Sequence, residues 1–135
     1  MIRLILVEDY AIIRAGLCRL METYEDITVV AAAADGESSV KLALEHQPDI
    51  VLMDIELPGI SGLNAASQIL KHCPHVRILL LSNYAGEAYV TQAIKIGAKG
   101  YVKKDSDVAD IRKAIDTVMS GQMYLAPNVL RFHVN

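Results

Sequence analysis

The sequence has little of several features that mark whole classes of protein. Its two cysteines, Cys18 and Cys73, lie far apart and form no CxxC motif, so both are expected to be ordinary reduced thiols rather than redox or zinc-binding groups. Its 16 acidic and 13 basic residues give a formal charge of −3 without a long basic run. The electrostatic footprint of a nucleic-acid binder is missing, and this chain alone is not expected to bind DNA.

Long apolar stretches are missing too. The N-terminal apolar run Leu4–Val7 is interrupted by Glu8 and Asp9, which makes it too short for a signal-peptide core and far too short to span a membrane. We therefore expect a cytoplasmic protein that does not bind membranes. A length of 135 residues, with 53% hydrophobic and 21% charged residues, suits one folded domain.

Short apolar runs alternate with longer segments whose apolar residues recur every three to four positions, and this rhythm predicts alternating strands and helices. The predicted strands are Ile2–Val7, Ile27–Ala32, Ile50–Met53, Val76–Leu81 and Gly100–Val102. The predicted helices are Ala11–Glu22, Gly36–His46, Gly62–Lys71, Gly86–Ile96 and Ser106–Ser120. The strands are almost continuously apolar, as expected of parallel strands covered on both faces.

Local signals support these boundaries. Asp35 and Ser61 are suitable helix N-caps, and Gly97 and Gly121 are suitable left-handed terminators of the last two helices. Right-handed crossovers then predict an α/β fold, a flavodoxin-like doubly wound sheet of five parallel strands in the order 2-1-3-4-5 with five helices.

Polar residues follow four of the predicted strands. Ligands of open α/β sheets bind at the carboxyl ends of the strands, so these residues are expected to meet in one acidic pocket. They are Glu8 and Asp9 after the first strand, Asp54 after the third, Ser82 after the fourth and Lys104 beyond the fifth. Singly, each has an ordinary structural explanation, such as a helix-capping acid or a turn serine. Together, at the ends of four strands, they indicate a site.

Charge balance suggests what this pocket binds. Glu8, Asp9 and Asp54 contribute −3, and Lys104 contributes +1, so a divalent ion brings the sum to zero. An all-oxygen ligand set favours Mg²⁺, which commonly bridges carboxylates to phosphate. A carboxylate can itself accept a phosphoryl group when cations neutralise the developing charge, and Asp54 is the best-placed nucleophile.

Four motifs carry a family resemblance, in matching order and spacing over nearly the whole chain. They are Ile5–Asp9, Asp49–Gly59, Leu80–Ser82 and Gly97–Asp105. On these motifs the chain resembles the response-regulator receiver domain of two-component signalling. The patterns Tyr10–Leu17 and Gly121–Pro127 are similar to the NarL/FixJ subfamily, whose members usually continue into a LuxR-type helix-turn-helix domain.

The resemblance implies roles for seven residues in three overlapping groups. The catalytic group is Asp54 as phosphoacceptor, Ser82 and Lys104, where Lys104 fits the motif better than the adjacent Lys103. The Mg²⁺ ligands are Glu8, Asp9, Asp54 and the main-chain carbonyl of Glu56. The switch pair is Ser82 and Tyr101. No cofactor besides Mg²⁺ is implied.

The resemblance also implies partners and organisation. A sensor histidine kinase would supply the phosphoryl group, and the chain would catalyse only its own phosphorylation and dephosphorylation. Phosphorylation would favour a homodimer and control an output, most simply transcription through a LuxR-type DNA-binding domain outside this chain. We expect a receiver domain over residues 1–121 and a tail or linker over 122–135. The chain is then either a receiver fragment of a transcription regulator or a stand-alone receiver.

Two further features invite hypotheses. Glu56 and Tyr84, two residues beyond Asp54 and Ser82, depart from the commonest receiver pattern and are expected to impede the water that hydrolyses the acyl phosphate. Arg14, on the first predicted helix, is either a kinase-docking residue or a solvated charge.

Three other classes of function stay open on the sequence. A hydrolase would use Asp54 as nucleophile and Glu56 as general acid, and would show steady turnover of a phosphoester. A flavin-binding domain shares the predicted fold, although the turn after Val7 is acidic rather than rich in hydroxyls and glycine. A receiver acting only as a phosphorylation-independent interaction module would take up no phosphate.

Overall fold

The computed structural model describes residues 1–83 and 86–125. Strands and helices alternate along the chain. In order they are β1 (Ile2–Val7), α1 (Ala11–Glu22), β2 (Ile27–Ala33), α2 (Gly36–His46), β3 (Ile50–Asp54), α3 (Gly62–His72), β4 (Arg77–Ser82), α4 (Glu87–Lys95), β5 (Gly100–Lys103), α5 (Val108–Met119) and β6 (Tyr124–Leu125). All five predicted helices and all five predicted strands are present, with ends within two residues of those predicted.

The strands form one parallel sheet in the order β2-β1-β3-β4-β5-β6. The predicted order of the first five strands is confirmed, but the predicted count of five is wrong. The sixth strand comes from the segment expected to be a tail, where the backbone N–H of Tyr124 donates to the carbonyl of Lys99 at 2.8 Å and Leu125 pairs with Tyr101. A strand of two residues is too short to show any periodicity in sequence.

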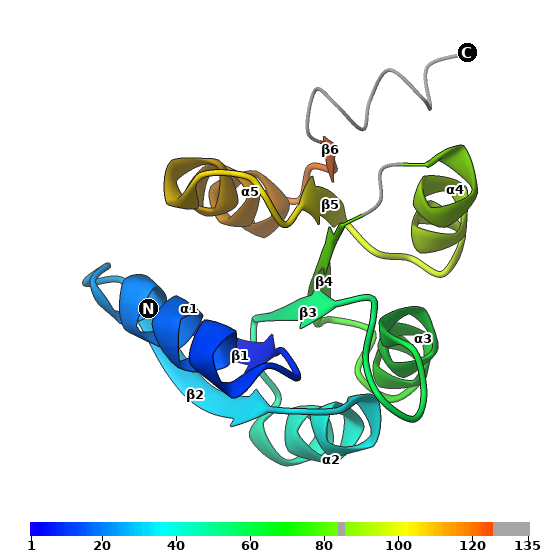
Figure 1. Ribbon diagram of the computed structural model, residues 1–135, viewed down its shortest axis with the longest axis horizontal. Coiled ribbons are helices and arrows are strands. Elements are labelled where there is room, and N and C mark those ends of the chain that lie inside the picture. The colour runs from blue at the N-terminus through cyan, green and yellow to red at the C-terminus, as the bar shows by residue number, and fades with distance from the viewer. Residues whose placement is uncertain (84–85, 126–135) are drawn as a thin grey trace.

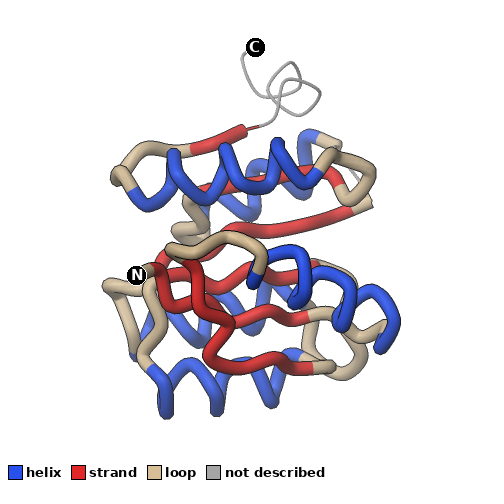
Figure 2. The backbone as a smooth tube through the Cα atoms, turned by 90° about the vertical axis from the view of Figure 1, so that its left-hand side faces the viewer, coloured by secondary structure: helices blue, strands red, loops and turns tan. Residues whose placement is uncertain are grey.

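Helices cover both faces of the sheet, as Figure 1 shows: α1 and α5 lie on one side, and α2, α3 and α4 on the other. Figure 2 views the molecule from the α1 and α5 side. Alternate residues of β1 enter the two apolar cores. Ile5 and Val7 pack with α2, α3 and α4, whereas Leu4 and Leu6 pack with α1 and α5. Burial on both faces explains why the strands are so uniformly apolar.

The ends of the helices follow the predicted signals. The side chains of Asp35 and Ser61 accept hydrogen bonds from the backbone N–H groups of Ser38 and Asn64, which confirms them as N-caps. Gly97 and Gly121 adopt positive φ angles of 100° and 92° after α4 and α5. The helices are short, and in the described part of the chain none combines the length and apolar character needed to cross a bilayer.

Arg112 fastens α5 to the turn before β2. Its guanidinium donates to both carboxylate oxygens of Asp26, at 2.7 and 2.6 Å, and also contacts Asp116 on its own helix. The same group lies 4.8 Å from the centre of the Tyr24 ring. The hydrogen bonds from Arg112 hold the pKa of the Asp26 carboxyl below its ordinary value.

We expect Asp26→Asn to lower the thermal unfolding temperature at neutral pH and to have little effect in strong acid. Because the folded-state pKa of Asp26 is lowered, its ionised form stabilises the fold above the ordinary pKa of 3.8, and this contribution is lost as the pH falls below that value. Thermal unfolding of both proteins across this range checks the prediction, with Glu25→Gln as an exposed neighbouring control. A deficit that persists in acid would contradict it.

Candidate functional site

Carboxylates from separate segments meet at the carboxyl end of the sheet. One oxygen from each of Glu8, Asp9 and Asp54 lies within 4.8 Å of the others. Glu8 follows β1 and Asp54 ends β3, and each is only 1% exposed, while Asp9 is half-buried. The neighbouring positions of β1 and β3 in the sheet bring these residues together, as the sequence predicted. We refer to these three residues as the acidic cluster.

Lys104 reaches the acidic cluster from beyond β5. Its Nζ lies 2.6 Å from Asp54 Oδ2 and 3.1 Å from Glu8 Oε2, and its side chain is 17% exposed. The backbone N–H of Lys104 donates to the carbonyl of Ser82 at 2.8 Å, which ties this loop to the end of β4. Lys103 instead lies 3.9 Å from Asp105. The structure therefore brings Lys104, the residue preferred from sequence, to the cluster.

The protonation equilibria reflect an unbalanced charge. Burial raises the pKa of Glu8, and the neighbouring Asp54 raises it further against the opposing effect of Lys104. Burial lowers the pKa of Lys104, but its hydrogen bonds to Asp54 and Glu8 outweigh this, and the net shift is upward. Three carboxylates and one ammonium sum formally to −2, so the cluster favours the binding of another cation.

The acidic cluster has the oxygen atoms that a divalent cation needs. Within the described residues, Glu8 Oε2 and Asp9 Oδ1 are buried and accept no hydrogen bond. Lys104 donates to Glu8 Oε1 at 3.4 Å, and its charge lies 3.1 Å from Oε2 without the geometry of a hydrogen bond. Buried carboxylate oxygens without such a partner are costly, and a metal ion would satisfy both. Hard oxygen ligands around a net charge of −2 fit Mg²⁺.

Asp54 is held on both sides. Its Oδ2 contacts Lys104, and its Oδ1 accepts a hydrogen bond from the backbone N–H of Glu56 at 3.0 Å. The Glu56 side chain is exposed, and its Oε1 accepts a hydrogen bond from Asn83 Nδ2 at 3.4 Å. Nothing in the sequence singled out Asn83. Tyr84, the other residue expected to border this site, lies outside the described residues.

Ser82 and Tyr101 lie on neighbouring strands of the sheet, β4 and β5. Ser82 ends β4 and is 0% exposed, and Tyr101 in β5 is 1% exposed. Burial raises the pKa of the Tyr101 phenol, and a hydrogen bond with the Ser82 side chain opposes this shift. The predicted switch pair is thus in direct contact, with the aromatic ring already inside the protein.

Two residues near the acidic cluster had no structural role in the sequence interpretation. Arg14 donates from Nη1 to the carbonyl of Glu8 at 2.8 Å. Gly62, at the start of α3, packs so closely against the backbone of Asp54 that a Cβ there would overlap the Asp54 carbonyl oxygen. Arg14 has a weak signal in the sequence, because it is an arginine five residues after an acidic pair. Gly62 has none, because close approach depends on the fold.

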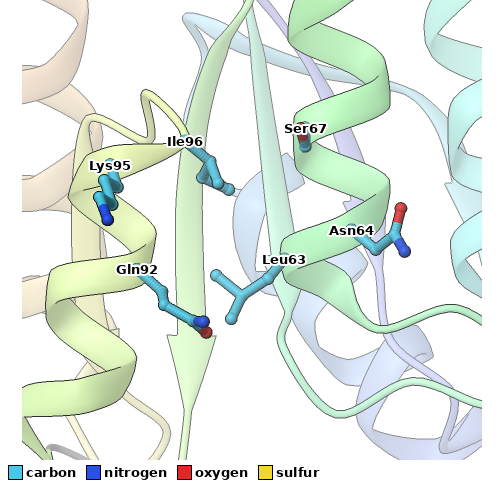
Figure 3. Close-up of a pocket in the computed structure, with 6 residues that line it drawn as sticks. All are labelled: Leu63, Asn64, Ser67, Gln92, Lys95 and Ile96. Atoms are coloured by element: carbon cyan, nitrogen blue, oxygen red, sulfur yellow. The ribbon is translucent and has the colours of Figure 1, made fainter.

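A separate groove of about 320 Å³ lies between α3 and α4, as Figure 3 shows. Its lining residues are Leu63, Asn64, Ser67, Gln92, Lys95 and Ile96. They include none of the acidic cluster, so this groove takes no part in the site described above.

Comparison with known proteins identifies the family. Residues 4–116 match the response regulator receiver domain. The response regulator GacA of Pseudomonas viridiflava is 35% identical over 129 residues, which cover 96% of this chain and 60% of that protein. The transcriptional regulatory protein LnrK of Bacillus subtilis is 38% identical, with 96% of this chain and 59% of that protein covered. The chain thus spans about 60% of the length of these curated relatives.

Solved structures agree. A LuxR-family two-component response regulator from Aurantimonas sp. SI85-9A1 superposes with a TM-score of 0.93 at 37% identity, over 97% of this chain and 94% of that one. Fold, acidic cluster and sequence matches lead to one conclusion: the chain belongs to the response regulator receiver domain family of two-component signalling, in its NarL/FixJ subfamily.

Proposed function

We propose that this receiver domain accepts a phosphoryl group on Asp54 from a sensor histidine kinase and changes conformation to control an output. One observation carries the proposal: a buried aspartate lies in an acidic cluster beside a lysine 2.6 Å away. Such a carboxylate has little structural purpose, because burying an ion pair costs desolvation free energy that the attraction between the two charges often does not recover. A role in the chemistry of the site explains its presence better.

In the proposed reaction, an oxygen of Asp54 attacks phosphorus and forms an O–P bond as the P–N bond of the phosphohistidine breaks. The electron pair of that bond stays on the departing imidazole. Lys104 already lies against Asp54 and would pair with a phosphoryl oxygen, and the Ser82 hydroxyl would donate to another. Both residues act through charge and position.

Mg²⁺ is the proposed cofactor. Glu8, Asp9 and Asp54 would hold it, with the main-chain carbonyl of Glu56 as a further ligand. Once bound, the ion would neutralise charge that develops on the transferring group. The two buried oxygens without hydrogen bonds, Glu8 Oε2 and Asp9 Oδ1, support this assignment.

Ser82 and Tyr101 are the proposed switch. A hydroxyl has one donor and two acceptor sites, so once Ser82 donates to the phosphoryl group its oxygen would be able to accept from the Tyr101 hydroxyl. Phosphorylation would then orient Ser82 as the donor and favour the buried position of the Tyr101 ring. Tyr101 belongs to β5 and shares an apolar core with residues of α4. A change in the position of its ring would therefore change the outer surface of β5 and α4.

The test of the proposed function is phosphate uptake from acetyl phosphate, with and without Mg²⁺, followed by intact mass and size. We expect one phosphate per chain only when Mg²⁺ is present, and a larger fraction of dimer after uptake. Steady release of acetate and phosphate without a phosphorylated protein would instead indicate a hydrolase. No uptake under any condition would leave only an interaction module.

The proposed kinase-docking surface is the start of α1. Ile12 is 87% exposed, Tyr10 is 64% exposed and Ile13 is 43% exposed, next to the acidic cluster on Glu8 and Asp9. A donor histidine must approach Asp54, so a contact surface beside the cluster is needed, and exposed apolar side chains supply it.

We expect Ile12→Asp to reduce phosphoryl transfer from the cognate kinase at least tenfold while uptake from acetyl phosphate stays unchanged, since a central apolar contact often contributes more than 1 kcal/mol. Leu44→Asp, on α2, is the matched control because Leu44 is also exposed, at 44%. Equal loss with both donors would show that Ile12 acts on the reaction itself.

Glu56 is expected to prolong the life of the acyl phosphate. Its carboxylate accepts a hydrogen bond from Asn83 at 3.4 Å, and its backbone N–H donates to Asp54, so its bulk and charge would hinder an attacking water. We expect Glu56→Asn to lose phosphate several-fold faster than the native chain, and Tyr84→Ala to add to this effect. The decay of phosphorylated protein after removal of donor, followed by intact mass, measures both. Slower decay in Glu56→Asn would contradict the assignment.

The organisation of the whole protein follows as part of the proposal. Residues 1–121 form the receiver, and 122–135 form a tail or linker that contributes β6. We propose a cytoplasmic protein that dimerises on phosphorylation and binds DNA only through a LuxR-type output domain, as the family of its structural relative suggests.

A further inference from the structure

The loop between β1 and α1 carries two of the three proposed metal ligands, yet the helix that follows lacks a capping side chain. Tyr10 is the N-cap of α1 and makes no side-chain cap hydrogen bond, and the first turn contains no acidic residue. By contrast, the N-caps of α2 and α3, Asp35 and Ser61, both accept a backbone hydrogen bond. Capping therefore does not fix the loop that holds Glu8 and Asp9.

Arg14 holds this loop instead. Its Nη1 donates to the carbonyl of Glu8 at 2.8 Å and approaches the carbonyl of Asp9 at 3.4 Å, while its backbone N–H donates to the carbonyl of Tyr10 at 2.8 Å. Two consecutive carbonyls thus face the Arg14 guanidinium, and the third accepts the ordinary backbone hydrogen bond of the helix. On the other side, the backbone N–H of Glu8 donates to Ala33 at 3.0 Å, so the loop is held between β2 and the second turn of α1.

We infer that Arg14 is a positioning residue for Mg²⁺ binding: it fixes the backbone of Glu8 and Asp9 so that their carboxylates stay close together in the acidic cluster. This inference rests on the proposed metal site. In this role Arg14 acts within the domain, rather than as a kinase-docking residue or a solvated charge. Outer groups that orient metal ligands commonly change metal affinity by about 10- to 100-fold when removed.

The direction of the effect separates positioning from simple charge. The guanidinium carries a positive charge close to the acidic cluster and so repels a cation, which means that its charge alone would weaken Mg²⁺ binding. If Arg14 acted only through this charge, Arg14→Gln would bind Mg²⁺ more tightly. If it positions the ligands, the same substitution weakens binding. The two roles predict opposite signs.

The experiment compares Mg²⁺ affinity, taken from the rise in unfolding temperature during Mg²⁺ titration without a phosphodonor, among the native chain and three variants. We expect Arg14→Gln to bind Mg²⁺ about tenfold more weakly. Arg14→Lys, which keeps the charge but lacks the planar fork, should fall between the two. Arg19→Gln removes an exposed positive charge from the last turn of the same helix and should match the native chain.

A second readout needs no metal. In Mg²⁺-free buffer, exchange of the Glu8 amide hydrogen, which bonds the carbonyl of Ala33, should be faster in Arg14→Gln than in the native chain, and unchanged in Arg19→Gln. Native-like or tighter Mg²⁺ binding by Arg14→Gln would overturn the inference and leave the proposed function intact. Failure of Mg²⁺ to stabilise the native chain would overturn the metal site, and with it the inference.

Discussion

Asp54→Asn is expected to abolish phosphate uptake, from one group per chain to none detectable. The substitution replaces the attacking carboxylate with an amide, which is a far poorer nucleophile. One of the two local hydrogen bonds survives, because the amide oxygen can still accept either from the backbone N–H of Glu56 or from Lys104. Intact mass after incubation with acetyl phosphate and Mg²⁺ measures the loss.

Stability serves as the control for this substitution. Two like charges about 4 Å apart cost roughly 4 kcal/mol at an effective dielectric of about 20, so neutralising Asp54 relieves its repulsion with Glu8. The substitution also removes the ion pair between Asp54 and Lys104, but Lys104 keeps Glu8 as a partner at 3.1 Å. Without Mg²⁺, Asp54→Asn should therefore be at least as resistant to urea as the native chain. Asp105→Asn, which changes an exposed acid in the loop after β5, should take up phosphate normally. Full uptake by Asp54→Asn would place the acceptor elsewhere.

Gly62→Ala should destabilise the fold by about 3 kcal/mol, near the upper end for overpacking of a buried site. The added Cβ would overlap the carbonyl oxygen of Asp54 and lie 2.7 Å from Cα of Ile55. Both contacts are backbone, so no side-chain rotation relieves them. The backbone N–H of Gly62 also donates to the Ile55 carbonyl at 2.7 Å, which keeps the two segments close. Urea unfolding measures the change.

Gly16→Ala is the matched control. Gly16 lies in α1, is exposed, and would place its Cβ in open space, since no atom beyond its chain neighbours and the nearby backbone of its own helix lies within 4 Å. The substitution should stabilise the protein by about 1 kcal/mol through helix propensity. Because Gly62 packs on Asp54, Gly62→Ala should also slow phosphate uptake, whereas Gly16→Ala should not. Equal stability of the two variants would contradict the close packing at Gly62.

The sequence predicted the strands and the acidic cluster well because both leave direct marks. Strands buried on two faces must be apolar throughout, and the polar residue that ends each one then stands out, as Asp54 does after β3. Parallel strands carry those residues to one edge. Glu8, Asp54 and Lys104, far apart in sequence, therefore converge as predicted.

Other features could not be read in this way because they depend on tertiary contact. β6 has two residues and forms only because its backbone meets the free edge of β5. The position of the Tyr101 ring depends on the space beside Ser82. Arg14 donates to backbone carbonyls, and every residue has such a carbonyl, so the sequence does not show which residues accept from it. The arginine itself was the single sign of this contact.

Locating the phosphoryl group tests the central claim most directly. Borohydride reduces an aspartyl phosphate to homoserine, and peptide mass mapping after treatment with acetyl phosphate then identifies the residue that carried it. Conversion confined to position 54, and dependent on Mg²⁺, is the result we predict. Conversion at Glu8 or Asp9, or labelling at 54 that is indifferent to Mg²⁺ removal, would contradict a site in which the acidic cluster and Lys104 act together on one aspartate.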